Sequence, residues 1–444
     1  MDVKTCLHRM IILQIGLIFT GLTMINPMHA ADSEKKAHPG SLPPVHVQNQ
    51  VRPLLNEVRN AQLDRDLPLV QNNIMKINKA LGDWAGNPET DPNYFSPIES
   101  MPPVKLRVGE LWRKIDDDTR ANAMWRNVPD GDPKKMKQGL RAAGRPIIAY
   151  SILYSLNSYK QQKQLNIVTK GANYLLDLQQ DNGLFPLPDL RGKDKRQTVA
   201  IKRVLRKNPA AYKDGWILKD HRGELLYDHA VAAVGMIEAF RITLDRRYYM
   251  SAEKASKWAM QQAIDTNWSN NAFAAWLLAE FYSISEKEVY LNTAIEKLKY
   301  GVLPGLMKNG RWIDPINSKL VHHAINVRGL LAVLRQLPEE HSFKEALENH
   351  TKNALDNAAA QINSKGASSV STSTEMLIDA ITEFGIDHKS WLHALYININ
   401  ASLKQLDNVK VADVGVYLPK FIQFMQKQKY LENHEVIKSW EKSQ

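Results

Sequence analysis

The stretch YDHAVAAVGMIEAFRITLDRRYYMSAEKASKWAMQQ, from Tyr227 to Gln262, decides the fold. Its apolar residues recur at three- and four-residue spacing over 230–240 and again over 252–263. That spacing is typical of two helices that bury one face, joined here by a short polar turn. Similar runs continue from residue 141 almost to the end of the chain, and no comparable run alternates with period two. The sequence therefore predicts an all-α protein.

The predicted helices repeat. Four of them begin with a polar pair and then turn apolar: Asp228-His229, Asn270-Asn271, His322-His323 and Thr374-Glu375. The first members of these pairs are 42, 52 and 52 residues apart, which fits two helices and their connections per unit. The segments 172–189 and 298–315 also share features: each has a predicted helix, then Asn-Gly, then an aromatic residue with a proline and an aspartate close behind it.

Two further segments precede this array. Residues 1–30 have a positive start, an apolar run from Met10 to Met24 and a small residue at Ala30, the pattern of a signal peptide. We expect cleavage after Ala30, a periplasmic or secreted protein, and no membrane span in the mature chain. Residues 31–140 are predicted to form a linker, helices and an aromatic, proline-rich loop, and residues 141–444 the helical array. The single cysteine, Cys6, lies in the signal, so the mature protein has no disulfide.

Positive charge is concentrated in one segment. The chain carries a net charge of +11, of which the signal peptide accounts for +1. Between Arg191 and Asp220 there are ten basic and three acidic residues, a net +7. A cationic protein outside the cytoplasm is expected to meet an anionic partner. We predict an acidic polysaccharide rather than nucleic acid, with Lys202, Arg203 and Arg206 among the binding residues.

The stretch from Tyr227 to Gln262 is similar to the helical-hairpin repeats of α/α-toroid enzymes, and LQQDNGLFPLPD (178–189) resembles their connection after an outer helix. This resemblance covers roughly residues 140–405. It implies an (α/α) toroid in which inner and outer helices alternate around a ring. Members of this superfamily include polysaccharide lyases, glycoside hydrolases, uronyl epimerases and triterpene cyclases. The location and charge of this chain favour the carbohydrate-active members.

Within that superfamily, the order of features resembles the alginate-lyase type, which has an Asn-Asn-His helix start and a later Tyr-His-Asn cluster. Asn270-Asn271 matches the first two positions, and His322-His323 lies where a later histidine is expected. Ala272 stands in place of the family's histidine, and no Tyr-His-Asn triplet follows. The resemblance therefore implies the fold more strongly than the chemistry.

A lyase acting on a uronate must neutralise the carboxylate, remove the proton at C5 and protonate the leaving oxygen. Asn270, Asn271 and Arg328 are candidates for neutralisation, His322 and His323 for the base, and Tyr227 for the proton donor. Asp228 lies beside Tyr227 in the same predicted cluster. We expect these residues to surround one cleft, because inner helices of a toroid start at the same end of the ring.

Two alternatives to β-elimination remain open. A glycoside hydrolase needs two carboxyl groups facing one bond, and the candidates are Asp228, Asp314, Glu375 and Asp189. The second alternative is a non-catalytic protein that binds or assembles envelope polysaccharide on the same scaffold, since a fold does not fix a function.

The sequence indicates no metal and no cofactor. His322 and His323 are adjacent, so they do not share one face of a helix, and there is no His-Glu-x-x-His run or phosphate-binding glycine motif. Tryptophans stack readily on sugar rings. Trp84 and Trp312 lie in predicted loops and are the expected sugar contacts, whereas Trp258 and Trp276 lie on apolar helix faces and are expected in the core.

Overall fold

A computed structural model describes residues 45–64, 66–81, 123–156, 162–193, 195–219, 224–265, 267–313, 317–405 and 416–427. The predicted signal peptide and its cleavage site, and the aromatic loop with Trp84, lie outside the described residues. In the described part of the chain, no helix combines the length and the apolar character needed to cross a bilayer.

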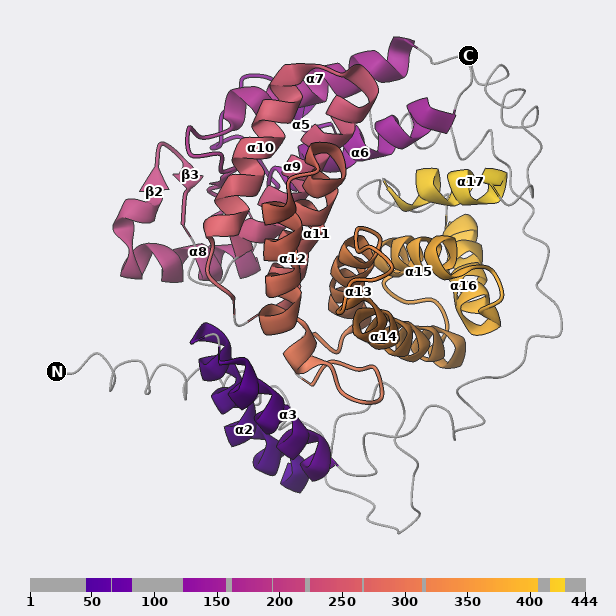
Figure 1. Ribbon diagram of the computed structural model, residues 1–444. Helices are drawn as coiled ribbons and strands as arrows, with labels where there is room; N and C mark the ends of the chain where they lie inside the picture. Colours follow the sequence, from indigo (N-terminus) through magenta and orange to yellow (C-terminus); the bar gives the residue numbers. More distant parts are fainter. Residues whose placement is uncertain are drawn as a thin grey trace. The chain divides into compact units, whose positions relative to one another are not determined.

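Six helices form a closed circuit in which each packs against the next and the last packs against the first. In chain order these inner helices are α6 (Arg141–Leu156), α9 (Glu224–Thr243), α11 (Trp268–Ser285), α13 (Leu320–Leu334), α15 (Val370–Phe384) and α17 (Tyr417–Lys427). The predicted all-α fold and ring of helices are confirmed by this packing (Figure 1).

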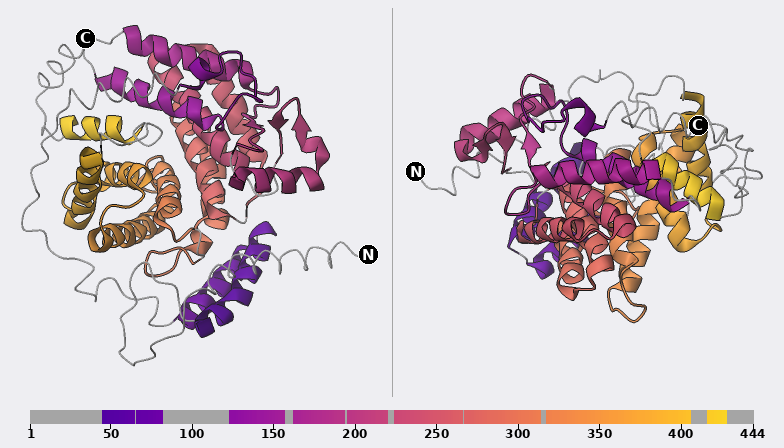
Figure 2. Two further views of the ribbon diagram at one scale, coloured as in Figure 1. Left: turned by 180° about the vertical axis from the view of Figure 1, so that it is seen from behind. Right: turned by 90° about the horizontal axis from the view of Figure 1, so that it is seen from above.

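Outer helices alternate with the inner ones along the chain and pack against them. They are α7 (Gln162–Leu178), α10 (Arg246–Gln261), α12 (Glu288–Gly301), α14 (Lys344–Lys365) and α16 (Lys389–Gln405). The pairs α13 with α14 and α15 with α16 are visible in Figure 2. Because each outer helix returns the chain, successive inner helices run in the same direction, and their N-termini meet at one end of the ring.

The sequences of the two layers differ as their burial requires. Helix α11 has buried residues on all sides, since Asn271, Phe273, Ala275 and Leu277 are all enclosed. The outer helix α10 instead buries one stripe and exposes charged residues on its other face. A helix that is apolar all round is stable only inside a protein, whereas a striped helix is suited to the surface.

Inner helices approach one another closely where small residues meet. A Cβ atom on Gly144 of α6 would overlap the carbonyl oxygen of Val231 on α9. Between α11 and α13, a Cβ atom on Gly329 would lie 2.9 Å from the carbonyl oxygen of Ala272. Because glycine has no side chain, the inner helices lie closer together at these crossings, and the interior of the ring is narrow.

The remaining elements lie outside the ring's two layers. They are the hairpin of α2 (Val45–Leu63) and α3 (Leu67–Leu81), the short α5 (Met124–Asn127), α8 (Lys195–Lys207), the 3-10 turns η4 (Pro209–Ala211) and η5 (Leu303–Gly305), and the strands β1 (Leu187–Pro188), β2 (Tyr212–Lys213) and β3 (Trp216–Ile217). The strands form a small antiparallel sheet in the order β1-β3-β2. The α2–α3 hairpin has its own small core, which also takes in Met307 beside η5.

The two predicted Asn-Gly turns have the same structure. Gly183 and Gly310 adopt φ values of 92° and 75°, a conformation that glycine tolerates and other residues rarely adopt. Each turn is seated on an outer helix, because a Cβ on Gly183 would overlap the backbone of Lys254, and one on Gly310 the backbone of Asn353. The sequence repeat between these segments is therefore a structural repeat.

Candidate functional site

A small cavity lies where the N-terminal halves of the inner helices converge. All six inner helices or the residues just before them contribute to its wall: Arg145, Ile148, Tyr227, Val231, Phe273, Trp276, Ile325, Arg328, Thr372, Glu375, Val416 and Lys420. Its volume of about 40 Å³ holds roughly three water-sized groups. The enclosed part therefore fits a polar substituent such as a carboxylate rather than a whole sugar ring.

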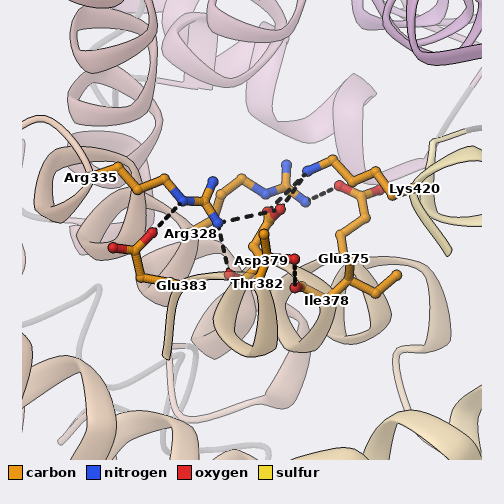
Figure 3. A network of polar contacts seen from close by, with 8 residues as sticks. All are labelled: Arg328, Arg335, Glu375, Ile378, Asp379, Thr382, Glu383 and Lys420. Atoms are coloured by element: carbon orange, nitrogen blue, oxygen red, sulfur yellow. Dashed lines mark hydrogen bonds and ion pairs between the residues drawn. The ribbon is translucent and has the colours of Figure 1, made fainter. Parts of the chain in front are cut away.

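One wall of the cavity is an ion pair beside an aromatic ring. The Arg328 guanidinium on α13 pairs with the Glu375 carboxylate on α15, as Figure 3 shows. The same guanidinium lies over the Trp276 ring on α11, 5.1 Å from its centroid. Its Nε atom is buried without a hydrogen-bond partner. The guanidinium lines the cavity and is the cation nearest to the Glu375 carboxylate there.

A second ion pair lies next to the first. Lys420 of α17 donates to both carboxylate oxygens of Asp379 on α15, at 3.1 and 2.9 Å. Burial alone raises the pKa of the Asp379 carboxyl, but Lys420 and Arg335 outweigh burial and hold that pKa below its usual value. The network continues to Glu383, which accepts from Arg335 Nε at 3.1 Å. Asp379 thus stays ionised and ties α17 into the ring.

The third part of the wall is Tyr227, in the first turns of α9. Arg145 on α6 donates a hydrogen bond to the Tyr227 hydroxyl at 3.0 Å. Arg141 lies over the phenol ring at 4.7 Å, and the ring stacks on Phe273 at 4.5 Å. Because the hydroxyl oxygen accepts from Arg145, its own proton is free to be donated to a bound ligand.

Of the predicted cluster, Tyr227 and Arg328 line the cavity, whereas Asp228, Asn270, Asn271, His322 and His323 do not. The expected convergence of helix starts is confirmed, but the residues that converge are mostly others. The helices begin two to four residues before each polar pair, at Glu224, Trp268, Leu320 and Val370. The pairs therefore lie within the first turns, and Asn267 rather than Asn270 or Asn271 caps α11.

Two first members of the polar pairs contact the preceding inner helix. Asp228 accepts from the backbone and the side chain of Arg141 at the start of α6, at 3.3 and 2.9 Å. His322 Nδ1 lies 3.3 Å from the Ser269 hydroxyl in α11. Asn270 is also buried. These contacts fasten neighbouring inner helices to one another at the cavity end.

In three of the four pairs, the second member reaches the following outer helix, whereas Glu375 of the fourth pair binds Arg328. Asn271 donates to the carbonyl oxygen of Gly301 at 2.9 Å, and His323 Nε2 lies 2.8 Å from the carbonyl oxygen of Ala354. His229 makes the equivalent contact with Ala255 at 3.0 Å. All three side chains are fully buried, so Asn271 and His323 are not exposed to a polymer. The prediction that both face the cleft is wrong, because their hydrogen bonds join the inner helices to the outer helices.

Burial also makes the two buried histidines poor bases. It lowers the pKa of His229 and of His323 to about 4, although the hydrogen bonds to Ala255 and Ala354 act in the opposite direction. A group with so low a pKa is neutral at pH 7 but accepts a proton reluctantly. The base expected at His323 is therefore better placed elsewhere.

Trp312 and Trp276 lie in the opposite environments from those predicted. Trp312 is completely buried, donates to the Val302 carbonyl at 3.1 Å and packs edge-on against His323. It cannot stack on a sugar, and that prediction is wrong, since its loop folds into the core. Trp276, expected in the core, is partly exposed and lines the cavity. Trp258 is buried, as predicted.

The proposed carboxyl groups of a hydrolase do not gather at one place. Glu375 lines the cavity, Asp228 is bound to Arg141, and Asp189 forms a bidentate pair with Arg191. Asp314 lies outside the described residues. Within the described ranges, no group of three or more metal-ligating side chains is present.

The cavity residues that the sequence analysis missed include Arg145, Val231, Phe273, Ile325 and Lys420. A signal for some of them exists in the helical register. Val231, Phe273 and Ile325 each lie three residues after the first member of their polar pair, and all three line the cavity. Lys420 follows a break in the repeat pattern, so no register was available for it.

No protein-family model matches the chain, and no curated protein matches it in sequence. Among solved structures it is similar to a glycosyl hydrolase family 88 protein from Bacteroides vulgatus, with 12% identity over 71% of this chain and 99% of that one, at a TM-score of 0.47. It is also similar to a polysaccharide lyase, with 12% identity over 73% of this chain and 98% of the other, at 0.48.

A third similar structure is a variant of the unsaturated glucuronyl hydrolase from Streptococcus agalactiae, with 13% identity over 71% of this chain and 82% of that one, at a TM-score of 0.43. The helix packing described above, rather than these likenesses, defines the architecture. By that packing, the fold is an α/α toroid with a polar cavity at the N-terminal end of its inner helices.

Proposed function

We propose that this protein is a carbohydrate-active enzyme that cleaves an acidic polysaccharide by β-elimination at the ring cavity. One observation carries the proposal: Arg328, Glu375 and Tyr227, from three different helices, line the same small polar space. These side chains provide a cation, a proton acceptor and a proton donor, which are the three functions that elimination from a uronate requires.

The Arg328–Glu375 pair couples binding to chemistry. A substrate carboxylate that enters the cavity competes with Glu375 for the Arg328 guanidinium. Neutralising the carboxylate makes the C5 proton more acidic. Glu375, released from Arg328, then accepts that proton, the C5 electron pair forms the C4–C5 double bond, and Tyr227 gives its proton to the departing glycosidic oxygen.

Arg145 and Trp276 support this assignment. Arg145 fixes the Tyr227 hydroxyl by a 3.0 Å hydrogen bond, which orients the donor before the substrate binds. Trp276 presents a partly exposed ring beside Arg328, and such a ring packs well against the apolar face of a sugar. Asn270 and His322, predicted from sequence to act in catalysis, instead help to position the inner helices.

A glycoside hydrolase is the second candidate, with Glu375 as one of its two carboxyl groups. Asp379, one helical turn further along α15, is the nearest carboxyl along that helix, but Lys420 and Arg335 lower its pKa. A hydrolase requires one carboxyl that remains protonated, which Asp379 does not provide. A non-catalytic polysaccharide-binding protein is the third candidate.

The test is a screen of acidic polysaccharides with two readouts, absorbance of the unsaturated product and new reducing ends. Elimination gives both, hydrolysis gives reducing ends alone, and a binding protein gives neither. Tyr227→Phe and Glu375→Gln are each expected to lower turnover by about 100-fold or more. Tyr154→Phe is the matched control, because Tyr154 lies on inner helix α6 outside the cavity wall.

We also propose that the protein acts outside the cytoplasm, on the basis of its predicted signal peptide. Sequencing the N-terminus of extracytoplasmic protein is expected to start at Ala31 or within a few residues of it. An intact Met1 on membrane-bound protein would reject cleavage and indicate an anchor.

A further inference from the structure

The two histidine-bearing units of the ring differ by one insertion. In both units an Asn-Gly turn lies in the connection after an outer helix, a buried aromatic follows, and an inner-helix histidine bonds the next outer helix. Phe185 precedes its histidine by 44 residues, whereas Trp312 precedes His323 by 11. The extra 33 residues account for α8 and the β1-β3-β2 sheet. We call residues 190–219 the basic arm.

The basic arm is rooted at the cavity end of the ring. Lys193 donates from Nζ to the carbonyl oxygens of Lys134 and Met136, at 2.6 and 2.7 Å, and Gly215 sits against Pro133. That stretch leads directly into α6, which carries Arg145. The other end of the arm leads into α9, which carries Tyr227. Both attachments are therefore close in sequence to cavity-lining residues.

The positive charges of the basic arm divide into two groups. Arg191 is bound to Asp189, and the Lys193 ammonium to backbone carbonyls, so these two fasten the arm. Lys202 and Arg206 are exposed on α8 and Arg203 is partly exposed, whereas Ile201 and Val204 form the buried face of the helix. Helix α8 contains no acidic residue at all, so its outward face carries charge of one sign.

We infer that the outward face of α8 is a docking surface for an acidic polysaccharide strand outside the cavity. The inference rests on the proposed function for the nature of the polymer. Lys202, Arg203 and Arg206 lie within about 6 Å of one another along the axis of α8, so they form a compact patch of positive charge outside the cavity. Within the described residues these three side chains form no ion pair, and a polyanion relieves the repulsion between their like charges.

The experiment measures binding and not turnover. The affinity for labelled polygalacturonate is compared at about 20 mM and about 300 mM salt, which changes the screening length several-fold. The variant Lys202→Gln/Arg203→Gln/Arg206→Gln is expected to bind about tenfold more weakly at low salt and within about twofold of wild type at high salt. Methyl-esterified polygalacturonate, which is neutral, is expected to show no such difference.

A matched control separates local from overall charge. Lys170→Gln/Arg246→Gln/Lys389→Gln removes the same charge from exposed positions on α7, α10 and α16 and is expected to leave binding nearly unchanged. An equal loss in both triple variants, or no salt-dependent binding by wild type, would overturn the inference. If the arm variant alone loses binding while wild type shows no turnover on any substrate, the proposed function fails and the docking surface stands.

Discussion

In the unit α7–α9–α10 and in the unit α12–α13–α14, a buried histidine joins the inner helix to the following outer helix. The two histidines differ in their surroundings. In the first, His229 uses both ring nitrogens, since Nδ1 accepts from the Phe185 backbone at 3.1 Å and Nε2 bonds Ala255. In the second, His323 bonds Ala354, but its Nδ1 atom is buried without a partner. In the unit that carries the 33-residue insertion, both ring nitrogens of the histidine therefore have hydrogen-bond partners, whereas in the other unit only one does.

This comparison separates structure from function within one repeat. The histidine, the glycine turn and the buried aromatic recur in both units, so packing alone explains them. The basic arm occurs in one unit and contributes nothing to the shared contacts. Polar residues that repeat around the ring are therefore interpreted as joints between helices, and the features that do not repeat are the better candidates for function.

The largest effect is expected on acid stability. The folded-state pKa of both histidines is about 4, and the ordinary value is 6.5. Between these two pH values the histidines bind protons in the unfolded chain but not in the folded protein. The free energy of unfolding therefore falls as the pH drops from about 6.5 towards 4. By pH 5 each histidine is expected to remove about 2 kcal/mol from the free energy of unfolding.

Urea denaturation at pH 7.5 and pH 5 measures this loss. Replacing both histidines with glutamine is expected to reduce the pH dependence, whatever it does to stability at pH 7.5. An unchanged slope in the double variant would show that other groups cause the acid sensitivity.

The glycine turns provide the next largest effect. Gly310→Ala introduces a Cβ that overlaps the Asn353 backbone at a φ of 75°, and is expected to lower the free energy of unfolding by about 3 kcal/mol. Gly192→Ala is the matched control, because its φ of 79° is similar and nothing lies within 4 Å of the added Cβ. It is expected to lose only about 1 kcal/mol. Equal losses would mean that the turn does not pack against α14.

The two histidines themselves sharpen the comparison. His229→Ala removes two hydrogen bonds and leaves the Phe185 N–H unpaired, whereas His323→Ala removes one. The first variant is expected to be less stable than the second by about 1 kcal/mol. Thermal denaturation at pH 7.5 decides the order, and a less stable His323→Ala would contradict the assignment of the unpaired nitrogen.

The smallest effect is expected from the basic arm. Because Lys202, Arg203 and Arg206 face outward and form no ion pair within the described ranges, the triple glutamine variant is expected to change stability by less than about 0.5 kcal/mol. The same urea measurement at pH 7.5 tests this. A larger loss would make the arm part of the folding unit and remove the contrast between the two repeats.

The sequence by itself determined the helical array and its repeat. Apolar spacing places helices from residue 141 onwards, and the Asn-Gly pairs place turns at Gly183 and Gly310 in the connections after outer helices, because both signals depend on local chemistry. Sequence also located the polar pairs and the concentration of positive charge. Tyr227 and Arg328, both singled out from the sequence, line one cavity at the end of the ring.

Only the tertiary structure decided which side of each helix faces the cavity. A shift of one residue rotates a side chain by about 100°, so Tyr227 lines the cavity while the adjacent Asp228 binds Arg141. The same rotation turns Asn271 and His323 towards outer helices, and it brings Trp276 into the wall. Lys420 enters the site only because α17 packs between α15 and α6 and closes the ring, a long-range contact that no local pattern encodes.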